Sequence, residues 1–148
     1  MNNKLKLLSI IGNELNKNEI TWAVGASCML YLNQIVNEFH DLDIMIDEND
    51  IEKAIEVFSK LGKLQEKFEN NQYKTKYFLE YIIDDIEVDV MAGFIIVKDG
   101  IDYEAHFDKN HIEKYVLVNG VSIPLQYKSD WKKYYSLMNR EYKANLCK

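Results

Sequence analysis

Aspartate alternates with aliphatic residues in two short stretches of this chain, and that pattern restricts the possible folds more than any other feature. The first stretch is Asp41-Leu-Asp-Ile-Met-Ile46 and the second is Ile86-Glu-Val-Asp-Val90. Alternation with a period of two predicts β-strands, each with one buried face and one face that carries charge. Because aspartate is a poor strand former, it needs a local reason to be there, and the usual reason is a bound cation.

Length and composition predict one ordinary hydrophobic core. The chain has 148 residues, of which 47% are hydrophobic and 12% aromatic, so we expect a single domain over residues 1–148. No stretch approaches the roughly 20 apolar residues needed to cross a bilayer, and the first residues lack a hydrophobic signal core. We therefore expect a cytoplasmic protein with no membrane partner. Cys28 and Cys147 suggest neither a disulfide framework nor a zinc site.

Charge is unevenly distributed along the chain. The net charge of −6 argues against a general nucleic-acid coating protein, which needs a basic surface. Basic residues are nevertheless frequent near the C-terminus, at Lys128, Lys132, Lys133, Arg140, Lys143 and Lys148. A solvated helix face is the more common explanation for such a cluster.

Hydrophobic periodicity predicts alternating helices and strands followed by a strand-rich region. We expect helices at residues 4–17, 27–36 and 49–61, and strands at residues 21–25 and 42–46. Further strands are expected at residues 73–83, 86–97, 103–107, 115–118 and 121–125, and a last helix begins at Ser129 or Asp130 and carries Tyr142. Asp84-Asp85 and Asn119-Gly120 are the predicted hairpin turns.

A predicted strand turns into a helix at Gly25-Ala26-Ser27. Free backbone N–H groups and the positive end of a helix dipole favour a phosphate at such a junction. Gly25 would let a ligand approach the backbone. Ser27 can either cap the helix or bind a phosphate oxygen, and capping is the more common role.

The carboxylates of the two alternating strands are candidate metal ligands. Asp41 and Asp43 are two residues apart, so both project from one face of a strand and can share a cation. Magnesium is the expected ion, since it prefers oxygen ligands and relieves the repulsion between the two carboxylates. Asp89 lies on the polar face of the second strand, as does Glu87. We prefer Asp89 as the third ligand because its shorter side chain is more rigid.

These motifs together resemble the nucleotidyltransferase superfamily, which includes DNA polymerase beta, the aminoglycoside and lincosamide nucleotidyltransferases and the type IV toxin–antitoxin nucleotidyltransferases. Gly25-Ala-Ser27 matches the glycine–serine motif, Asp41-Leu-Asp43 the paired aspartates, and Asp89 the third aspartate. The resemblance covers residues 20–92. It implies an α+β fold with a mixed β-sheet, helices packed mainly on one face, and a C-terminal helix.

The resemblance also implies a reaction, in which a nucleoside monophosphate passes from an NTP to an acceptor hydroxyl and pyrophosphate is released. Asp41, Asp43 and Asp89 would be the catalytic residues and would hold two Mg²⁺ ions. The NTP would be bound by Gly25, Ala26 and Ser27. Lys132, Lys133 and Arg140 are added to the phosphate contacts from their charge alone.

The chain departs from the family pattern in two places. Ala26 stands where a second glycine is often found, and Asn37-Glu-Phe-His40 supplies no basic residue before the aspartate pair. His40 is expected to point to the face opposite Asp41. A rival zinc site at His106, Asp108 and His111 is less favoured, because no cysteine or metalloprotease spacing accompanies these residues.

The acceptor and the partners are less constrained. A small molecule, including an antibiotic, or a macromolecule would suit the implied chemistry. We also expect a homodimer that completes the acceptor pocket. A non-catalytic nucleotide-binding or toxin–antitoxin component with the same fold is the alternative, and the presence of all the aspartates argues against it.

Overall fold

The computed structural model of the chain describes residues 2–66 and 72–148. The helices are α1 (Asn3–Lys17), α2 (Ala26–Leu32), α3 (Ile51–Leu61), α4 (Lys128–Leu137) and α5 (Glu141–Ala144). The strands are β1 (Trp22–Gly25), β2 (Leu42–Ile46), β3 (Lys63–Leu64), β4 (Tyr77–Ile83), β5 (Ile86–Ala92), β6 (Phe94–Lys98), β7 (Ile101–Ala105), β8 (Ile112–Val118) and β9 (Val121–Gln126). Short 3₁₀ turns lie at Glu48–Asp50 and Lys109–His111.

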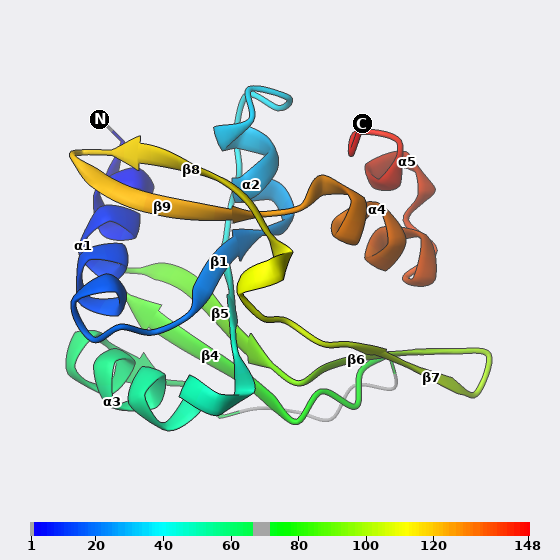
Figure 1. The fold of residues 1–148 in the computed structure, drawn as a ribbon, viewed down its shortest axis with the longest axis horizontal. Helices are drawn as coiled ribbons and strands as arrows, with labels where there is room; N and C mark the ends of the chain where they lie inside the picture. Colours follow the sequence, from blue (N-terminus) through cyan, green and yellow to red (C-terminus); the bar gives the residue numbers. More distant parts are fainter. Residues whose placement is uncertain (1, 67–71) are drawn as a thin grey trace.

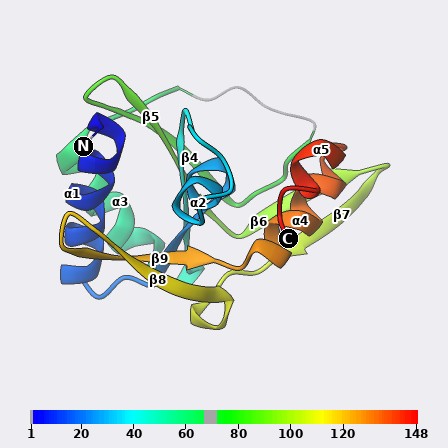
Figure 2. The same ribbon diagram turned by 90° about the horizontal axis from the view of Figure 1, so that it is seen from above.

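Within the described residues, seven strands form one mixed sheet in the order β3-β4-β5-β2-β1-β9-β8 (Figure 1). β2 pairs with β5 in parallel, as β1 does with β9, and the other neighbours are antiparallel. β6 and β7 form a separate hairpin, and β6 lies against α4 (Figures 1 and 2). The expected α+β class, with its mixed sheet and C-terminal helix, is confirmed.

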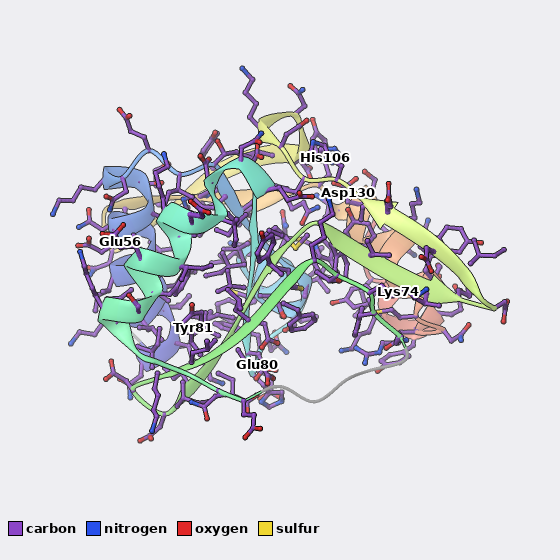
Figure 3. All side chains as sticks on the ribbon, turned by 90° about the horizontal axis from the view of Figure 1, so that it is seen from below. Glu56, Lys74, Glu80, Tyr81, His106 and Asp130 are labelled. Carbon is purple, nitrogen blue, oxygen red and sulfur yellow. The ribbon has the colours of Figure 1, made fainter. Side chains whose placement is uncertain are left out.

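α1 and α3 pack on one face of the sheet. The Phe58 ring of α3 stacks on the Tyr81 ring of β4 with 5.2 Å between ring centroids. Figure 3 labels Tyr81 on the side of the sheet that α3 covers. α1 approaches closely at Gly12, where an added Cβ would lie 2.6 Å from Ile123 Cδ1. Because side chains alternate along a strand, burial of Leu42 and Ile44 on this face directs the residue between them to the other face.

Three predicted elements are shorter than expected or are divided in two. The helix predicted over residues 27–36 stops at Leu32, since the chain turns through Gln34 with φ 64°. The strand predicted over residues 86–97 divides at Gly93, whose φ of 62° is costly for any residue with a side chain. The last helix divides near Asn139, where φ is 61°, so α5 has a new direction.

The predicted hairpins are present. Asn119 and Gly120 connect β8 to β9 with φ values of 51° and 78°, as a two-residue hairpin turn requires. Asp84 and Asp85 do the same between β4 and β5, with φ values of 51° and 64°. The strand predicted from Tyr73 begins four residues later. Among the described helices, none has the length and apolar character of a membrane span.

Candidate active site

The pairing of β2 with β5 brings two of the candidate metal ligands side by side. The strands run parallel, and Asp43 lies opposite Asp89 in their register. The apolar neighbours of both aspartates are fully buried, so the two carboxylates share the face opposite α1 and α3. Asp41 precedes the first residue of β2 and lines the same cavity.

A cavity of about 300 Å³ lies over this face. Ser27 lines it from α2, and Arg140 and Lys143 line it from the C-terminal segment. Aromatic side chains form much of the remaining wall, at Tyr73, Phe78, Phe94, Trp131 and Tyr135. Carboxylates, a hydroxyl and two cationic side chains therefore surround one space.

Burial and neighbouring charges perturb the Asp43 carboxyl. Its pKa is raised from 3.8 to about 8, first by burial and then by the negative charges of Asp89 and Asp41. The positive charges of Lys143 and Arg140 oppose this rise. A carboxyl whose pKa is raised this far by burial and by negative neighbours lies in a site where positive charge is insufficient.

Asp41 and Glu87 interact with each other at the edge of the site. The pKa of Glu87 is raised by the charge of Asp41 and by a hydrogen bond between the two side chains. Glu87 is exposed, and the cavity lining includes Asp89 but not Glu87. The structure therefore places Asp89 in the cavity with Asp41 and Asp43, and Glu87 beside Asp41 outside the cavity lining.

The donor atoms suit a divalent cation, although the side chains are not gathered around one point. Among residues 2–66 and 72–148, no three His, Cys, Asp or Glu side chains form a ready metal site. Burial, and then the charges of Asp89 and Asp41, raise the pKa of Asp43, and a cation would oppose both effects. Oxygen ligands are the ones that Mg²⁺ prefers, so the residues fit such an ion by chemistry.

The turn between β1 and α2 differs in detail from the prediction. Gly25 is the N-cap residue of α2 and has no side chain to cap it, so the more common role predicted for Ser27, that of helix cap, is wrong. Ala26 and Ser27 line the cavity. Ala26 adopts φ 53°, which is unusual for a residue with a Cβ. Gly25 does not line the cavity; its Cα faces the Trp131 indole instead.

The basic residues at the cavity are only partly those predicted. Arg140 lines the cavity as expected, together with Lys143, which was not among the predicted contacts. Lys132 and Lys133 are exposed on α4 and are absent from the lining, so the structure does not bring them to the cavity. After the break between α4 and α5, Arg140 and Lys143 lie at the cavity with the carboxylates.

Comparison of the structure with solved structures places this site in a known fold. A candidate nucleotidyltransferase from Thermotoga maritima superposes with a TM-score of 0.75 at 26% identity, over 97% of this chain and 89% of that one. ANT(2″)-Ia in complex with adenylyl-2″-tobramycin gives 0.67 at 12% identity, over 99% and 88% of the chains. The lincosamide adenylyltransferase LnuA, bound to lincomycin, gives 0.64 at 13%, over 99% and 96%.

No protein-family model matches the sequence, and no curated protein matches it either. The structural matches span nearly the whole chain. This chain has the nucleotidyltransferase fold. The resemblance drawn from Gly25-Ala-Ser27, Asp41, Asp43 and Asp89 is thereby confirmed at the level of the superfamily.

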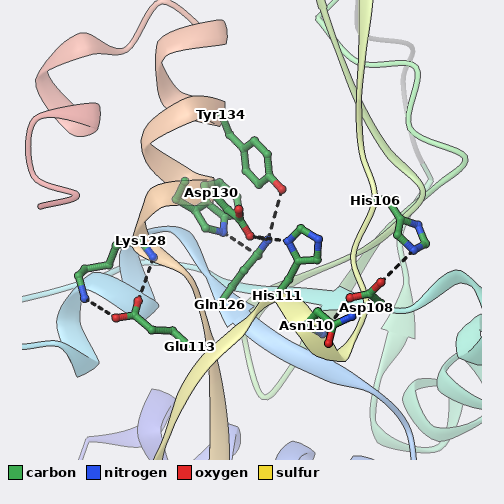
Figure 4. Close-up of polar contacts among 10 residues, drawn as sticks. His106, Asp108, Asn110, His111, Glu113, Gln126, Lys128, Asp130 and Tyr134 are labelled. Atoms are coloured by element: carbon green, nitrogen blue, oxygen red, sulfur yellow. Dashed lines mark hydrogen bonds and ion pairs between the residues drawn. The ribbon is translucent and has the colours of Figure 1, made fainter.

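The histidines of this nucleotidyltransferase fold occupy three separate environments. His40 lines the cavity, contrary to the expectation that it points to the opposite face; β2 begins only at Leu42, so strand alternation does not extend to it. His106 lies 3.5 Å from Asp108, whereas His111 contacts Asp130 at 2.8 Å. Figure 4 shows these two pairs apart, which argues against the rival zinc site.

In the ligand-free protein, Asp43→Asn is expected to increase stability at alkaline pH. The raised pKa of Asp43 means that the folded protein retains a proton that the unfolded chain releases, so stability falls as pH rises from the unfolded to the folded pKa. Urea unfolding without divalent cations should show the variant more stable by roughly 1–3 kcal/mol at about pH 9 and nearly equal to wild type at about pH 4. A difference that is constant with pH would contradict this assignment.

Ala26→Gly is expected to leave stability unchanged or to raise it by up to roughly 1 kcal/mol, because glycine adopts positive φ without strain. Ala54→Gly is the matched control, since Ala54 is a buried residue within α3 and its replacement should cost about 1 kcal/mol. Chemical denaturation of both variants measures the difference. Equal losses at the two positions would show that Ala26 is unstrained.

Proposed function

We propose that this chain is a metal-dependent nucleotidyltransferase that transfers a nucleoside monophosphate from an NTP to an acceptor hydroxyl. The observation that carries the proposal is that Asp41, Asp43 and Asp89 line one cavity with Arg140 and Lys143. Carboxylates suit divalent cations, and the basic side chains suit the phosphates that such cations accompany. Adenylyltransferases among the structural neighbours support the same reaction class.

In this proposal, Asp41, Asp43 and Asp89 hold two Mg²⁺ ions. When bound, the ions neutralise the charge of the carboxylates and of the triphosphate. Asp89 accepts, or helps to accept, the proton of the acceptor hydroxyl. The new bond joins the acceptor oxygen to the α-phosphorus, the bond from that phosphorus to the bridging oxygen breaks, and pyrophosphate leaves with the bonding electrons. Arg140 and Lys143 offset its charge.

The acceptor is proposed to be a hydroxylated molecule, and antibiotics are the first ones to test. ANT(2″)-Ia is known in complex with adenylyl-2″-tobramycin, and LnuA is known bound to lincomycin. A homodimer that closes the acceptor side of the cavity is part of the proposal. A native mass equal to one chain at high protein concentration would remove the dimer from it.

Replacing a cavity aspartate should abolish pyrophosphate release. Each of Asp43→Asn and Asp89→Asn is expected to lower the rate at least ~100-fold, because each removes a charge that would hold the metal at the reacting phosphate. Asp85→Asn, at the exposed turn between β4 and β5 and outside the cavity lining, should change the rate by less than about threefold. The assay follows pyrophosphate release with Mg²⁺, each NTP and a panel of hydroxylated acceptors.

Retained activity in both aspartate variants would exclude the mechanism. If the wild-type protein binds NTP but releases no pyrophosphate with any acceptor, a non-catalytic nucleotide-binding role replaces the enzymatic one. A large loss in Glu87→Gln with activity retained in Asp89→Asn would assign the third carboxylate to Glu87.

Lys143→Met should raise the KM for NTP about tenfold, because a charge-assisted hydrogen bond to a phosphate is lost. Lys132→Met is the matched control, since Lys132 is exposed on α4 and lies outside the cavity lining. Steady-state kinetics with varied NTP separates the effect on KM from that on kcat. Equal effects of both substitutions would show that general charge, and not the position of Lys143, attracts the nucleotide.

A further inference from the structure

The turn between β1 and α2 rests directly on the indole ring of Trp131. A Cβ at Gly25 would lie 2.3 Å from Trp131 Nε1 and 2.5 Å from Cε2, distances that no side chain tolerates. No atom therefore fits between the turn and the ring. The position of the indole consequently sets the position of the backbone that precedes Ala26 and Ser27 at the cavity.

Gln126 holds this indole in one orientation. Trp131 Nε1 donates a hydrogen bond to Gln126 Oε1 at 2.8 Å, and an indole nitrogen can only donate. The Gln126 amide nitrogen must then face the other way, where it donates to Asp130 Oδ2 at 3.2 Å and to the Tyr134 hydroxyl at 3.3 Å (Figure 4). Gln126 is fully buried, so it has little freedom to release the ring.

The indole also reaches toward the basic side of the cavity. The Trp131 and Tyr135 rings pack with 5.4 Å between centroids, and Lys143 Nζ lies 5.6 Å from the centroid of the Tyr135 ring. A continuous series of contacts thus runs from Gly25 through two aromatic rings to Lys143. The rings act as a spacer between Ser27 on one side of the cavity and Lys143 on the other.

We propose that Trp131, oriented by Gln126, is a positioning residue that sets the gap between the β1–α2 turn and Lys143, and with it the affinity for a polyphosphate. This inference rests on the proposed function, because it assigns the gap to the phosphates of the NTP. A rigid spacer lowers the cost of ordering the two sides when the ligand binds. Neither Gln126 nor Trp131 touches the reacting atoms in this assignment.

Three variants distinguish an effect on ligand affinity from an effect on stability. They are Gln126→Met, Trp131→Phe and the double variant. Each single substitution leaves a buried polar partner unsatisfied and should lower Tm by about 5 °C. The double variant removes both ends of the hydrogen bond and should regain at least about half of that loss. The affinity for pyrophosphate in the presence of Mg²⁺ is measured by calorimetry. It should be about tenfold weaker than in the wild type, in the double variant as in the single variants.

Trp22→Phe is the matched control. Trp22 Nε1 also donates to an amide, Asn16 Oδ1, at 2.9 Å, but Trp22 lies at the start of β1 and outside the cavity lining. The affinity for pyrophosphate should not change in this variant. If Trp131→Phe does not fold, Gln126→Met still tests the orientation of an intact ring.

The outcomes separate the inference from the proposed function. Full recovery of pyrophosphate affinity together with Tm in the double variant would overturn the inference, because the pair would then be structural only. Unchanged affinity in all three variants would overturn it as well, and in both cases the proposed function stands. Failure of the wild-type protein to bind either pyrophosphate or NTP would overturn the proposed function.

Discussion

Repulsion between neighbouring carboxylates is the constraint on which the rest of this site depends. Parallel pairing of β2 with β5 sets Asp43 opposite Asp89, and the buried residues around them prevent either strand from turning its polar face away. Burial of Asp43, together with the charges of Asp89 and Asp41, raises its pKa. Folding alone does not remove this cost, whereas the cations of the proposed function would do so by placing positive charge between the carboxylates.

The positive charge that opposes this repulsion comes from a different part of the chain. Arg140 and Lys143 both act to lower the pKa of Asp43, and both belong to the segment that follows the break near Asn139. An uninterrupted helix would have given these residues the direction of α4, whose lysines at its centre point to solvent. The break therefore converts part of a solvated basic surface into one wall of the cavity.

Strand alternation was sufficient to predict that Asp43 and Asp89 project from the polar faces of their strands, since a period of two determines which side chains share a face. It also predicted the hairpin at Asn119-Gly120, where local backbone preference decides the turn. His40 and Lys143 could not be found in this way. His40 precedes the first strand residue, and the place of Lys143 depends on a positive φ at Asn139 and on tertiary packing. Charge alone suggested Lys132 and Lys133, which the helix directs away from the cavity.

Gly25 shows how one sequence signal can have two physical origins. A glycine before a helix suggests close approach of a ligand to the backbone, but here the close neighbour is Trp131. Packing thus shapes the turn before any ligand arrives, and Gln126 limits the movement of the ring that supports it. The carboxylates are different, because no three of the described residues 2–66 and 72–148 converge as a ready metal site. Packing within the chain therefore fixes the β1–α2 turn, whereas the sheet aligns Asp43 with Asp89 without gathering the described carboxylates around one point.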